Sequence, residues 1–227
     1  TNFAMASQDV RYYLNGLLFE VTSNSIRSVA TDGHRLALAD VEFSNKTSSD
    51  VSMIIPRKGV LELLKLLAGS DEKNVSLSIG NNGIGVTIGS QIMKIKLLEG
   101  NFPDYTRVIP KESNNFMLAD REELRSVLTR TSILSNEKFR GIRLTLNKNL
   151  VKAIAHNPEK EEAEEDLEVR YTGDDLEVGF NVAYLLDVLG ILKCETVRLD
   201  VIDANSSCLI TDPEKSNAKY VVMPMRL

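Results

Sequence analysis

The sequence predicts an α+β fold in two tandem domains. With 227 residues, the chain is long enough for two domains of about 100 to 150 residues each. Segments of the first half recur in the second half in the same order, and each half combines alternating strand patterns with helix-like segments. We place the boundary in the polar stretch Pro110–Asn115, which gives domains 1–112 and 113–227.

The first repeated segment opens each half. Phe3–Ala6 reads FAMA and Phe116–Ala119 reads FMLA, and a helix is expected after each of them. In the second copy, Asp120 and Glu123 form a capping box ahead of an apolar face. In the first copy we expect a shorter helix over Ser7–Asn15, ending at Gly16.

The second repeated segment is a short strand, a turn and an amphipathic helix. It occurs as Ile54–Leu67 and again as Gly179–Leu192. Pro56 fits the N-terminal end of its helix, where a missing N–H costs little. Each helix leads into a strand with period-2 patterning, Val75–Ile79 in the first half and Val197–Val201 in the second.

Further strands are expected between the two helices of each half. Turn signals such as Asn81–Gly83 separate alternating segments. Each half should therefore contain two helices and seven or eight strands, and the strands not yet named are 17–21, 26–30, 35–41, 141–146, 151–155 and 166–171.

Composition excludes several classes of protein. The formal net charge of −5 argues against indiscriminate adhesion to nucleic acid, although it allows a locally basic surface. No apolar run approaches the roughly 20 residues of a membrane span. The two cysteines, Cys194 and Cys208, do not suggest a disulfide framework, so reduced thiols in a cytoplasmic protein are expected.

An acidic run occupies Glu159–Glu168, which holds seven carboxylates. The favoured interpretation is a solvated hairpin edge that resists unwanted strand pairing. A metal site is the alternative, and no converging second set of ligands supports it. We therefore expect no metal.

Thr31–Leu36 is the stretch that most resembles an active site. A hydrolase would use Asp32 to orient His34 as a base, with Ser28 or Thr31 as the nucleophile. Neighbouring side chains on a strand or tight turn point apart, and Asp-Gly is a strong hairpin signal, so a turn is the simpler interpretation. The sequence also lacks the common phosphate-loop, dinucleotide and zinc-protease motifs. We expect a binding protein without enzymatic activity or cofactor.

The chain ends on an apolar run, Tyr220–Leu227, although terminal residues that bury nothing are usually polar. Tyr220–Met223 suits a final core strand. Pro224 ends ladder pairing, so Met225 and Leu227 must pack elsewhere.

Several long motifs, in order, resemble the bacterial DNA polymerase III beta subunit family of sliding clamps. The resemblance covers the whole chain, and its motifs are Gln8–Gly16, Ala30–Ala37, Pro56–Gly59, Gly100–Tyr105, Ile133–Gly141, Asn157–Glu165 and Tyr220–Leu227. It implies a processivity factor of the replicase, whose subunits have three similar clamp domains. Two subunits close head to tail into a ring around duplex DNA.

This chain resembles only the second and third clamp domains. The chain also begins without methionine, so we expect that the first domain is absent. Ile133 and Leu134 match third-domain positions of the homodimer interface, whose partner surface is on a first domain. The resemblance therefore implies a homodimer for the full-length protein and a monomer for this chain.

The resemblance also implies a DNA-facing surface, because the family's helices line the hole of the ring. Arg11, Arg57, Lys58, Lys65, Arg121 and Arg125 fall on or beside the expected helices. Gln8, Tyr12 and Tyr13 match positions near DNA, and tyrosines can stack on exposed bases. Core packing is the alternative role for the tyrosines. Encirclement would hold the DNA without sequence specificity, so the protein itself need bind only weakly.

Finally, the resemblance implies a hydrophobic pocket between the second and third domains that binds short linear motifs of polymerases, the clamp loader and repair proteins. Methionines that can repack suit many different peptides. Carried over by motif, the pocket comprises Leu14, Thr31, Gly33, His34, Arg35, Leu36, Pro103, Arg107, Val108, Val221, Met223, Pro224, Met225 and Arg226, with Asn181, Tyr184 and Ser207 at a polar subsite.

Overall fold

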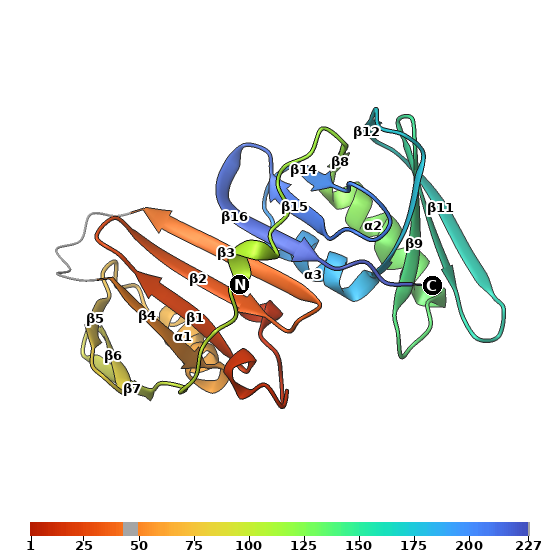
Figure 1. Ribbon diagram of the computed structural model, residues 1–227. Coiled ribbons are helices and arrows are strands. Elements are labelled where there is room, and N and C mark those ends of the chain that lie inside the picture. The colour runs from red at the N-terminus through yellow and green to blue at the C-terminus, as the bar shows by residue number, and fades with distance from the viewer. Residues whose placement is uncertain (43–49, 227) are drawn as a thin grey trace. The chain divides into compact units, whose positions relative to one another are not determined.

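The computed structural model describes residues 1–42 and 50–226. These residues form two compact units, Thr1–Asp104 (unit 1) and Tyr105–Leu227 (unit 2). The domain boundary predicted from the sequence was 112/113. Both units combine helices with antiparallel sheets, which confirms the α+β fold class (Figure 1). Leu227, the last residue of the terminal motif, lies outside the described residues.

Unit 1 is built on an antiparallel sheet with the strand order β3-β2-β1-β4. Both faces of this sheet bury apolar side chains. Val29 lies opposite Leu38 on one face, Ala30 lies opposite Ala37 on the other, and all four are 0 to 5% exposed. Helix α1 packs on β1 and β4. The bounds are β1 Gly16–Val21, β2 Ser25–Thr31, β3 Arg35–Glu42, β4 Val51–Pro56 and α1 Arg57–Ala68.

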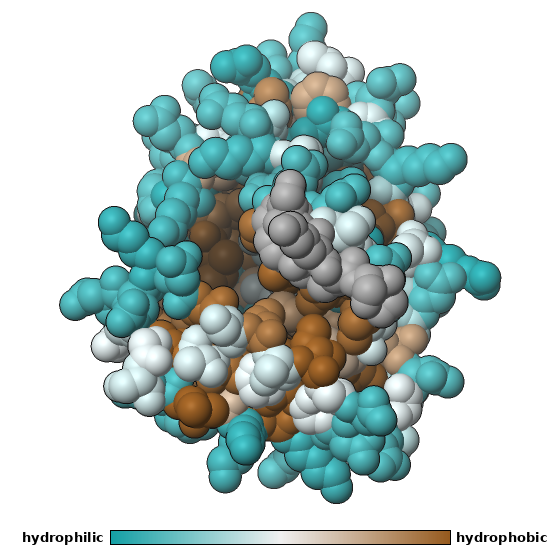
Figure 2. All heavy atoms as spheres, turned by 90° about the vertical axis from the view of Figure 1, so that its left-hand side faces the viewer, coloured by the Kyte–Doolittle hydropathy of each residue, from teal (hydrophilic) through white to brown (hydrophobic). Residues whose placement is uncertain are grey.

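A smaller antiparallel sheet completes unit 1, with the strand order β5-β6-β7. It consists of β5 Ser76–Ile79, β6 Gly83–Ile88 and β7 Gln91–Lys96. The middle strand buries Ile84, Val86 and Ile88, whereas every residue of β5 is exposed. Figure 2 looks at this end of the unit and shows apolar side chains among the polar ones.

The prediction of a helix over Ser7–Asn15 is wrong. The structure has only short 3-10 turns near this segment, Asn2–Ala4 and Tyr12–Leu14. Asn15 Oδ1 accepts from the Asp9 N–H at 2.9 Å, and Asn15 Nδ2 donates to the Asp9 carbonyl at 2.8 Å. Such side chains compete with the backbone bonds of a helix, and Gln8 has a φ of 60° that no α-helix accepts. Within its described residues, unit 1 therefore contains one α-helix where two were expected.

Unit 2 contains two antiparallel sheets and two helices. One sheet has the order β12-β8-β14-β15-β16, and the other has the order β11-β10-β9-β13. Helix α2 contacts β8, β10 and β11, and α3 contacts β13 and β16, so each helix packs on both sheets. The bounds are β8 Phe116–Asp120, α2 Arg121–Thr131, β9 Gly141–Asn147, β10 Leu150–His156, β11 Glu162–Glu168, β12 Arg170–Tyr171, β13 Leu176–Asn181, α3 Val182–Ile191, β14 Thr196–Asp200, β15 Cys208–Asp212 and β16 Lys215–Val222.

Side chains cap the two helices of unit 2. The predicted cap at Asp120 is confirmed, because its Oδ1 accepts from the Glu123 N–H at 2.9 Å. Asn181 caps α3 in the same way through the Ala183 N–H, also at 2.9 Å. In the part of the chain that the structure describes, no helix has the length and apolar character needed to cross a membrane.

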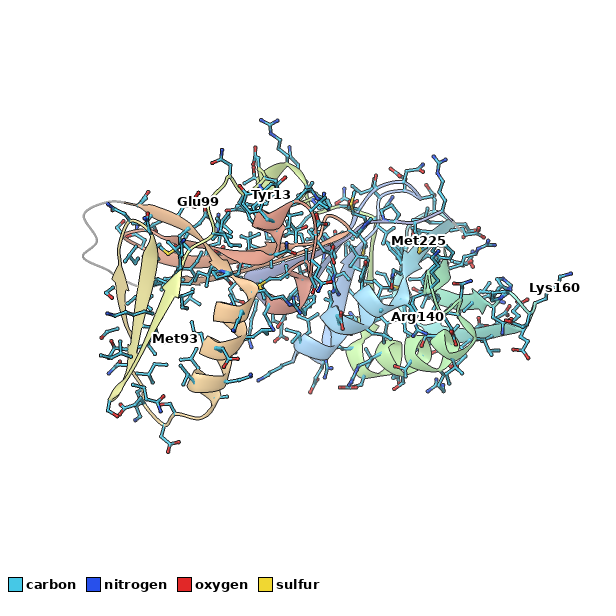
Figure 3. The ribbon with its side chains drawn as sticks, turned by 90° about the horizontal axis from the view of Figure 1, so that it is seen from below. Tyr13, Met93, Glu99, Arg140, Lys160 and Met225 are labelled. Atoms are coloured by element: carbon cyan, nitrogen blue, oxygen red, sulfur yellow. The ribbon has the colours of Figure 1, made fainter. Side chains whose placement is uncertain are left out.

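The acidic run forms an edge, as predicted. β11 pairs with β10 alone in its sheet. Lys160 lies at the tip of the β10–β11 hairpin and points away from the rest of unit 2 (Figure 3). The expected strand 166–171 is corrected, because Val169 separates the end of β11 from the two-residue strand β12.

Candidate functional site

The turn between β2 and β3 is held by its own side chains. The Asp32 carboxylate accepts from the backbone N–H groups of His34 and Arg35 at 2.9 and 3.0 Å, and from Arg35 Nε at 3.0 Å. The Thr31 hydroxyl donates to the Arg35 carbonyl at 2.7 Å. Gly33 has a φ of 90°, which favours glycine. The predicted Asp-Gly hairpin turn is therefore present.

Asp32 and His34 do not form a catalytic pair in this turn. Both carboxylate oxygens of Asp32 bind the backbone of the turn or the Arg35 guanidinium. Arg35 also donates to the Phe3 carbonyl at 2.8 Å and lies 5.4 Å from the Phe3 ring centroid. Asp32 and Arg35 thus shape the turn, and the exposed His34 side chain is presented to solvent.

An ion pair orders the loop before β1. Arg11 donates to the Asp9 carboxylate through Nε at 3.0 Å and Nη2 at 2.9 Å. These hydrogen bonds lower the pKa of Asp9 to about 2. Arg11 Nη2 also donates to the Asp32 carbonyl at 3.3 Å, which joins the loop to the β2–β3 turn.

Tyr12 and Tyr13 lie next to this ion pair. Their ring centroids are 5.8 Å apart in an edge-to-face arrangement, and Tyr12 is 54% exposed. Tyr13, labelled in Figure 3, is half-buried. Tyr12 therefore presents a ring on which a base or a peptide side chain could stack. Tyr13 is partly packed against the protein and partly exposed to solvent.

Arg57 and Lys58 form the first turn of α1. Arg57 Nη1 donates to the Met5 carbonyl at 3.0 Å, and the Arg57 backbone N–H donates to the Asn15 carbonyl at 2.9 Å. A hollow beside them brings together cations, amides and apolar side chains. One carboxylate accompanies the cations, and the lining residues are Ser7, Gln8, Asn15, Arg57, Lys58, Leu61, Glu62, Leu64, Lys65 and Ala68. The structure thus gathers Gln8, Arg57, Lys58 and Lys65 on one surface of unit 1.

The two arginines expected on the first helix of unit 2 differ in their availability. Arg121 donates to the carbonyls of Cys194 and Leu189 at 2.8 and 3.2 Å, and its side chain is 15% exposed. Arg125 is 48% exposed and lies 3.5 Å from Glu122. Arg121 therefore ties α2 to the end of α3, and Arg125 remains accessible.

The C-terminal segment changes character after β16. Tyr220, Val221 and Val222 are buried, which matches the predicted core strand, although the strand ends at Val222 and not at Met223. Met223 is 44% exposed. The Met225 N–H donates to the Gly179 carbonyl of β13 at 2.9 Å, so the tail lies along that strand (Met225 is labelled in Figure 3).

The other residues expected to bind peptides are divided between the interior and the surface. Leu14, Leu36 and Val221 are 2 to 3% exposed. Asn181 caps α3, Tyr184 lies half-buried on that helix, and Ser207 lies half-buried just before β15. Pro103, Arg107 and Val108 are exposed, Pro103 in unit 1 and the other two in unit 2.

Ile133 lies in a 3-10 turn, Ser132–Leu134, that follows α2 and contacts β10 and β11. Its side chain is 75% exposed, and Leu134 is half-buried. Such exposure of an isoleucine suits a surface that another molecule covers.

Residues 1–42 and 50–226 contain no group of three or more His, Cys, Asp or Glu side chains placed to hold a metal ion.

Two family models match the chain one after the other. The model of the DNA polymerase III beta subunit central domain matches residues 1–104, and that of the C-terminal domain matches residues 106–226. The chain belongs to the DNA polymerase III beta subunit family. The matched ranges also agree with the two units of the structure.

Relatives in this family are similar over the whole chain. The beta sliding clamps of Pseudomonas aeruginosa and Escherichia coli K12 are each 51% identical over 227 residues. The chain spans 62% of the length of each of these relatives. The hydrolase alternative receives no support from these matches.

Solved beta subunit structures have the same fold. A crystal structure of the P. aeruginosa subunit is 51% identical with a TM-score of 0.96, covering all of this chain and 62% of that one. A P. aeruginosa structure bound to griselimycin is 50% identical with a TM-score of 0.94, covering 61% of that chain. A Caulobacter crescentus clamp with PEG bound to a putative beta-motif tethering region is 34% identical with a TM-score of 0.95, again covering 61% of that chain. The whole of this chain is covered in both comparisons.

One feature of this beta subunit chain was not predicted from its sequence. A cavity in unit 2 is lined by Asn136, Phe139, Gly141, Arg143, Ile154, His156, Met225 and Arg226. Only Met225 and Arg226 were expected at a binding site. The alternation along β9 and β10 could have placed Arg143 and Ile154 on outward faces, but their pairing depends on a strand register that no local motif specifies.

Proposed function

We propose that this chain is part of a ring-shaped sliding clamp, the processivity factor of a bacterial replicase. The observation that carries the proposal is the match of the entire chain, at 51% identity, to proteins named beta sliding clamp. The clamp encircles duplex DNA and tethers polymerases, the clamp loader and repair proteins, in the cytoplasm and without catalysis of its own.

Contact with DNA is assigned to a mildly basic surface of unit 1. Gln8, Arg57, Lys58 and Lys65 share one hollow, and Arg11 and Tyr12 lie on the loop that includes Gln8. Lys65 is paired with Glu62 at 2.9 Å, which reduces its pull on phosphates. Each neutralised phosphate releases counterions and adds affinity, so few contacts favour sliding over tight attachment.

The test of encirclement uses the natural full-length protein. After loading onto nicked circular DNA, we expect it to remain bound, and we expect it to dissociate when the circle is linearised. Blocking both ends of the linear DNA with bulky proteins should restore retention. Equal retention on open linear DNA would contradict the proposal, because adhesion would then replace topology.

Peptide binding is assigned to residues contributed by both units. Unit 1 contributes the β2–β3 turn, Thr31–Leu36, with Leu14 and Pro103. Unit 2 contributes Arg107, Val108, Asn181, Tyr184, Ser207 and the tail, Val221–Arg226. Support comes from the exposed apolar side chain of Met223 after a buried strand, and from the P. aeruginosa relative that binds griselimycin.

Met223 offers a direct test of this site. We expect Met223→Ala to weaken a polymerase-tail peptide by about 1 to 3 kcal/mol, the range of a buried apolar anchor. Met93 on β7 is half-buried and outside the proposed site, so Met93→Ala is the matched control. Titration calorimetry measures both, and an unchanged affinity for Met223→Ala would remove the tail from the site.

Ile133 and Leu134 are assigned to the interface of a homodimer. The surface that the resemblance pairs with them lies outside these 227 residues. We therefore expect the 227-residue chain by itself to sediment mainly as a monomer. A stable dimer that Ile133→Asp leaves intact would contradict this assignment.

A further inference from the structure

The cavity in unit 2 lies on the outward face of the sheet β11-β10-β9-β13. Its volume is about 420 Å³. Ile142 and Leu144 on β9 are 0 and 2% exposed, so Arg143 between them points to the opposite face. Arg143 is paired directly with Ile154 of β10 on one side and with Gly179 of β13 on the other. The floor of the cavity is therefore formed by β9 and β10, and Gly179 of β13 lies in the same row beside Arg143.

Two segments outside the sheet form the walls. The first is the tail, whose Met225 N–H is bonded to Gly179 in that same row. The second is the turn before β9, in which the Asn136 side chain accepts from the N–H groups of Lys138 and Phe139 at 2.9 and 3.0 Å. This turn holds Phe139, which is 56% exposed. Both walls are thus fixed by hydrogen bonds.

The lining combines apolar and cationic groups. Phe139, Ile154 and Met225 offer apolar contact, Arg143 and Arg226 carry positive charge, and no carboxylate is among the lining residues. Two carboxylates lie beside the lining, with Glu177 3.5 Å from Arg143 and Glu162 3.6 Å from His156. Glu177 is 58% exposed, so its ion pair with Arg143 is easily exchanged for another carboxylate.

We propose that this cavity is a subsite for an acidic residue that lies next to an apolar residue, in the segment flanking the linear motif of a clamp-binding peptide. The proposal rests on the proposed function, because Met225 and Arg226 belong to both sites. Continuity favours a peptide, because Met225 lines the cavity and is bonded to Gly179, and Asn181 of the proposed peptide site lies two residues beyond Gly179 on β13. The apolar contacts orient the flank, and Arg143 binds its carboxylate.

The test uses two fluorescent peptides that share a polymerase-tail motif. One carries an Asp-Leu extension and the other an Asn-Ser extension. Each is made in two versions, with the extension before the motif or after it. For the natural sequence, we expect the acidic extension at one end to tighten binding about 5-fold at low salt. Arg143→Ala should abolish this gain and leave the Asn-Ser peptide unchanged. Phe139→Ala should reduce the gain in affinity, because it removes an apolar contact with the leucine of the extension.

Arg170→Ala is the matched control. Arg170 is exposed on β12 in the other sheet of unit 2, so the gain should persist in this variant. Thermal unfolding followed by circular dichroism confirms that each variant is folded. Because Arg143 and Phe139 are at least partly exposed, both variants should fold.

The outcomes separate this inference from the proposed function. If the core motif binds and Met223→Ala weakens it, but neither acidic extension gives a gain, the subsite is overturned and the clamp assignment stands. If no motif peptide binds, both are overturned. Equal displacement of the acidic peptide by single-stranded DNA, sensitive to Arg143→Ala, would overturn the peptide assignment in favour of phosphate binding.

Discussion

The carboxylate of Asp200 provides a sharp test of how unit 2 is held together. Asp200 is 1% exposed and accepts from the Arg198 guanidinium at 2.7 and 2.9 Å. It also accepts from the Ser113 N–H at 2.8 Å, while Arg198 Nη2 donates to the Ser113 carbonyl at 3.0 Å. Arg198 lies 4.1 Å from the Phe116 ring centroid. This network ties the segment before β8 to β14.

Asp200→Ala removes the acceptor of three of these bonds, two from Arg198 and one from the Ser113 N–H, and leaves the bond from Arg198 to the Ser113 carbonyl. Losing one partner of a buried ion pair costs about 3 to 5 kcal/mol of unfolding free energy. The Arg198 side chain is 20% exposed, so water can solvate part of its charge. We therefore expect a loss of about 2 to 4 kcal/mol.

Urea unfolding followed by circular dichroism measures the loss, since the chain has no tryptophan. Faster amide exchange at Ser113 should accompany it, because that N–H loses its acceptor. Asp175→Ala, at an exposed position, is the control and should stay within about 0.5 kcal/mol. A loss below about 1 kcal/mol for Asp200→Ala, with unchanged exchange at Ser113, would refute the reasoning.

Other predictions concern single groups. The pKa of Asp9 is about 2 because of Arg11, so the ion pair stabilises the loop above the ordinary pKa of 3.8, and this stabilisation is lost as the pH falls through 2. Carbon-13 NMR of Asp9 should show this, and Arg11→Ala should return the pKa toward 3.8. Burial raises the pKa of Cys208, which is 0% exposed, so a thiol reagent at pH 8 should modify the half-buried Cys194 first and Cys208 only on unfolding; equal rates would contradict this. Asp120→Ala should lower stability by about 1 kcal/mol through loss of the α2 cap, measured by urea unfolding against Asp175→Ala.

Local patterns predicted those elements whose signals lie within a few residues. The strands β1, β2, β3, β9 and β10 and the cap at Asp120 were predicted because the signal for each depends on side chains close in sequence. The helix over Ser7–Asn15 was wrong because it was expected from the repeat of the segment before α2, whereas Asp9 and Asn15 bond each other. Side-chain competition of this kind is hard to weigh from spacing alone.

The candidate sites were predictable only through resemblance. Arg121 was expected to face DNA, yet its guanidinium binds carbonyls near the end of α3, 68 and 73 residues further along the chain. The cavity beside Arg143 depends on the register of three strands and on the path of the tail across them. Contacts between residues so distant in sequence leave no local pattern to recognise.

The bond from Met225 to Gly179 has a mechanical consequence. β16 belongs to one sheet of unit 2, and β13 is one of the two edge strands of the other. The last residues of the chain therefore act as a strap that fastens the two sheets together and covers part of an open strand edge. A ligand that lifts the strap would loosen both sheets at once, so its arrival should be detectable as faster amide exchange far from the ligand itself.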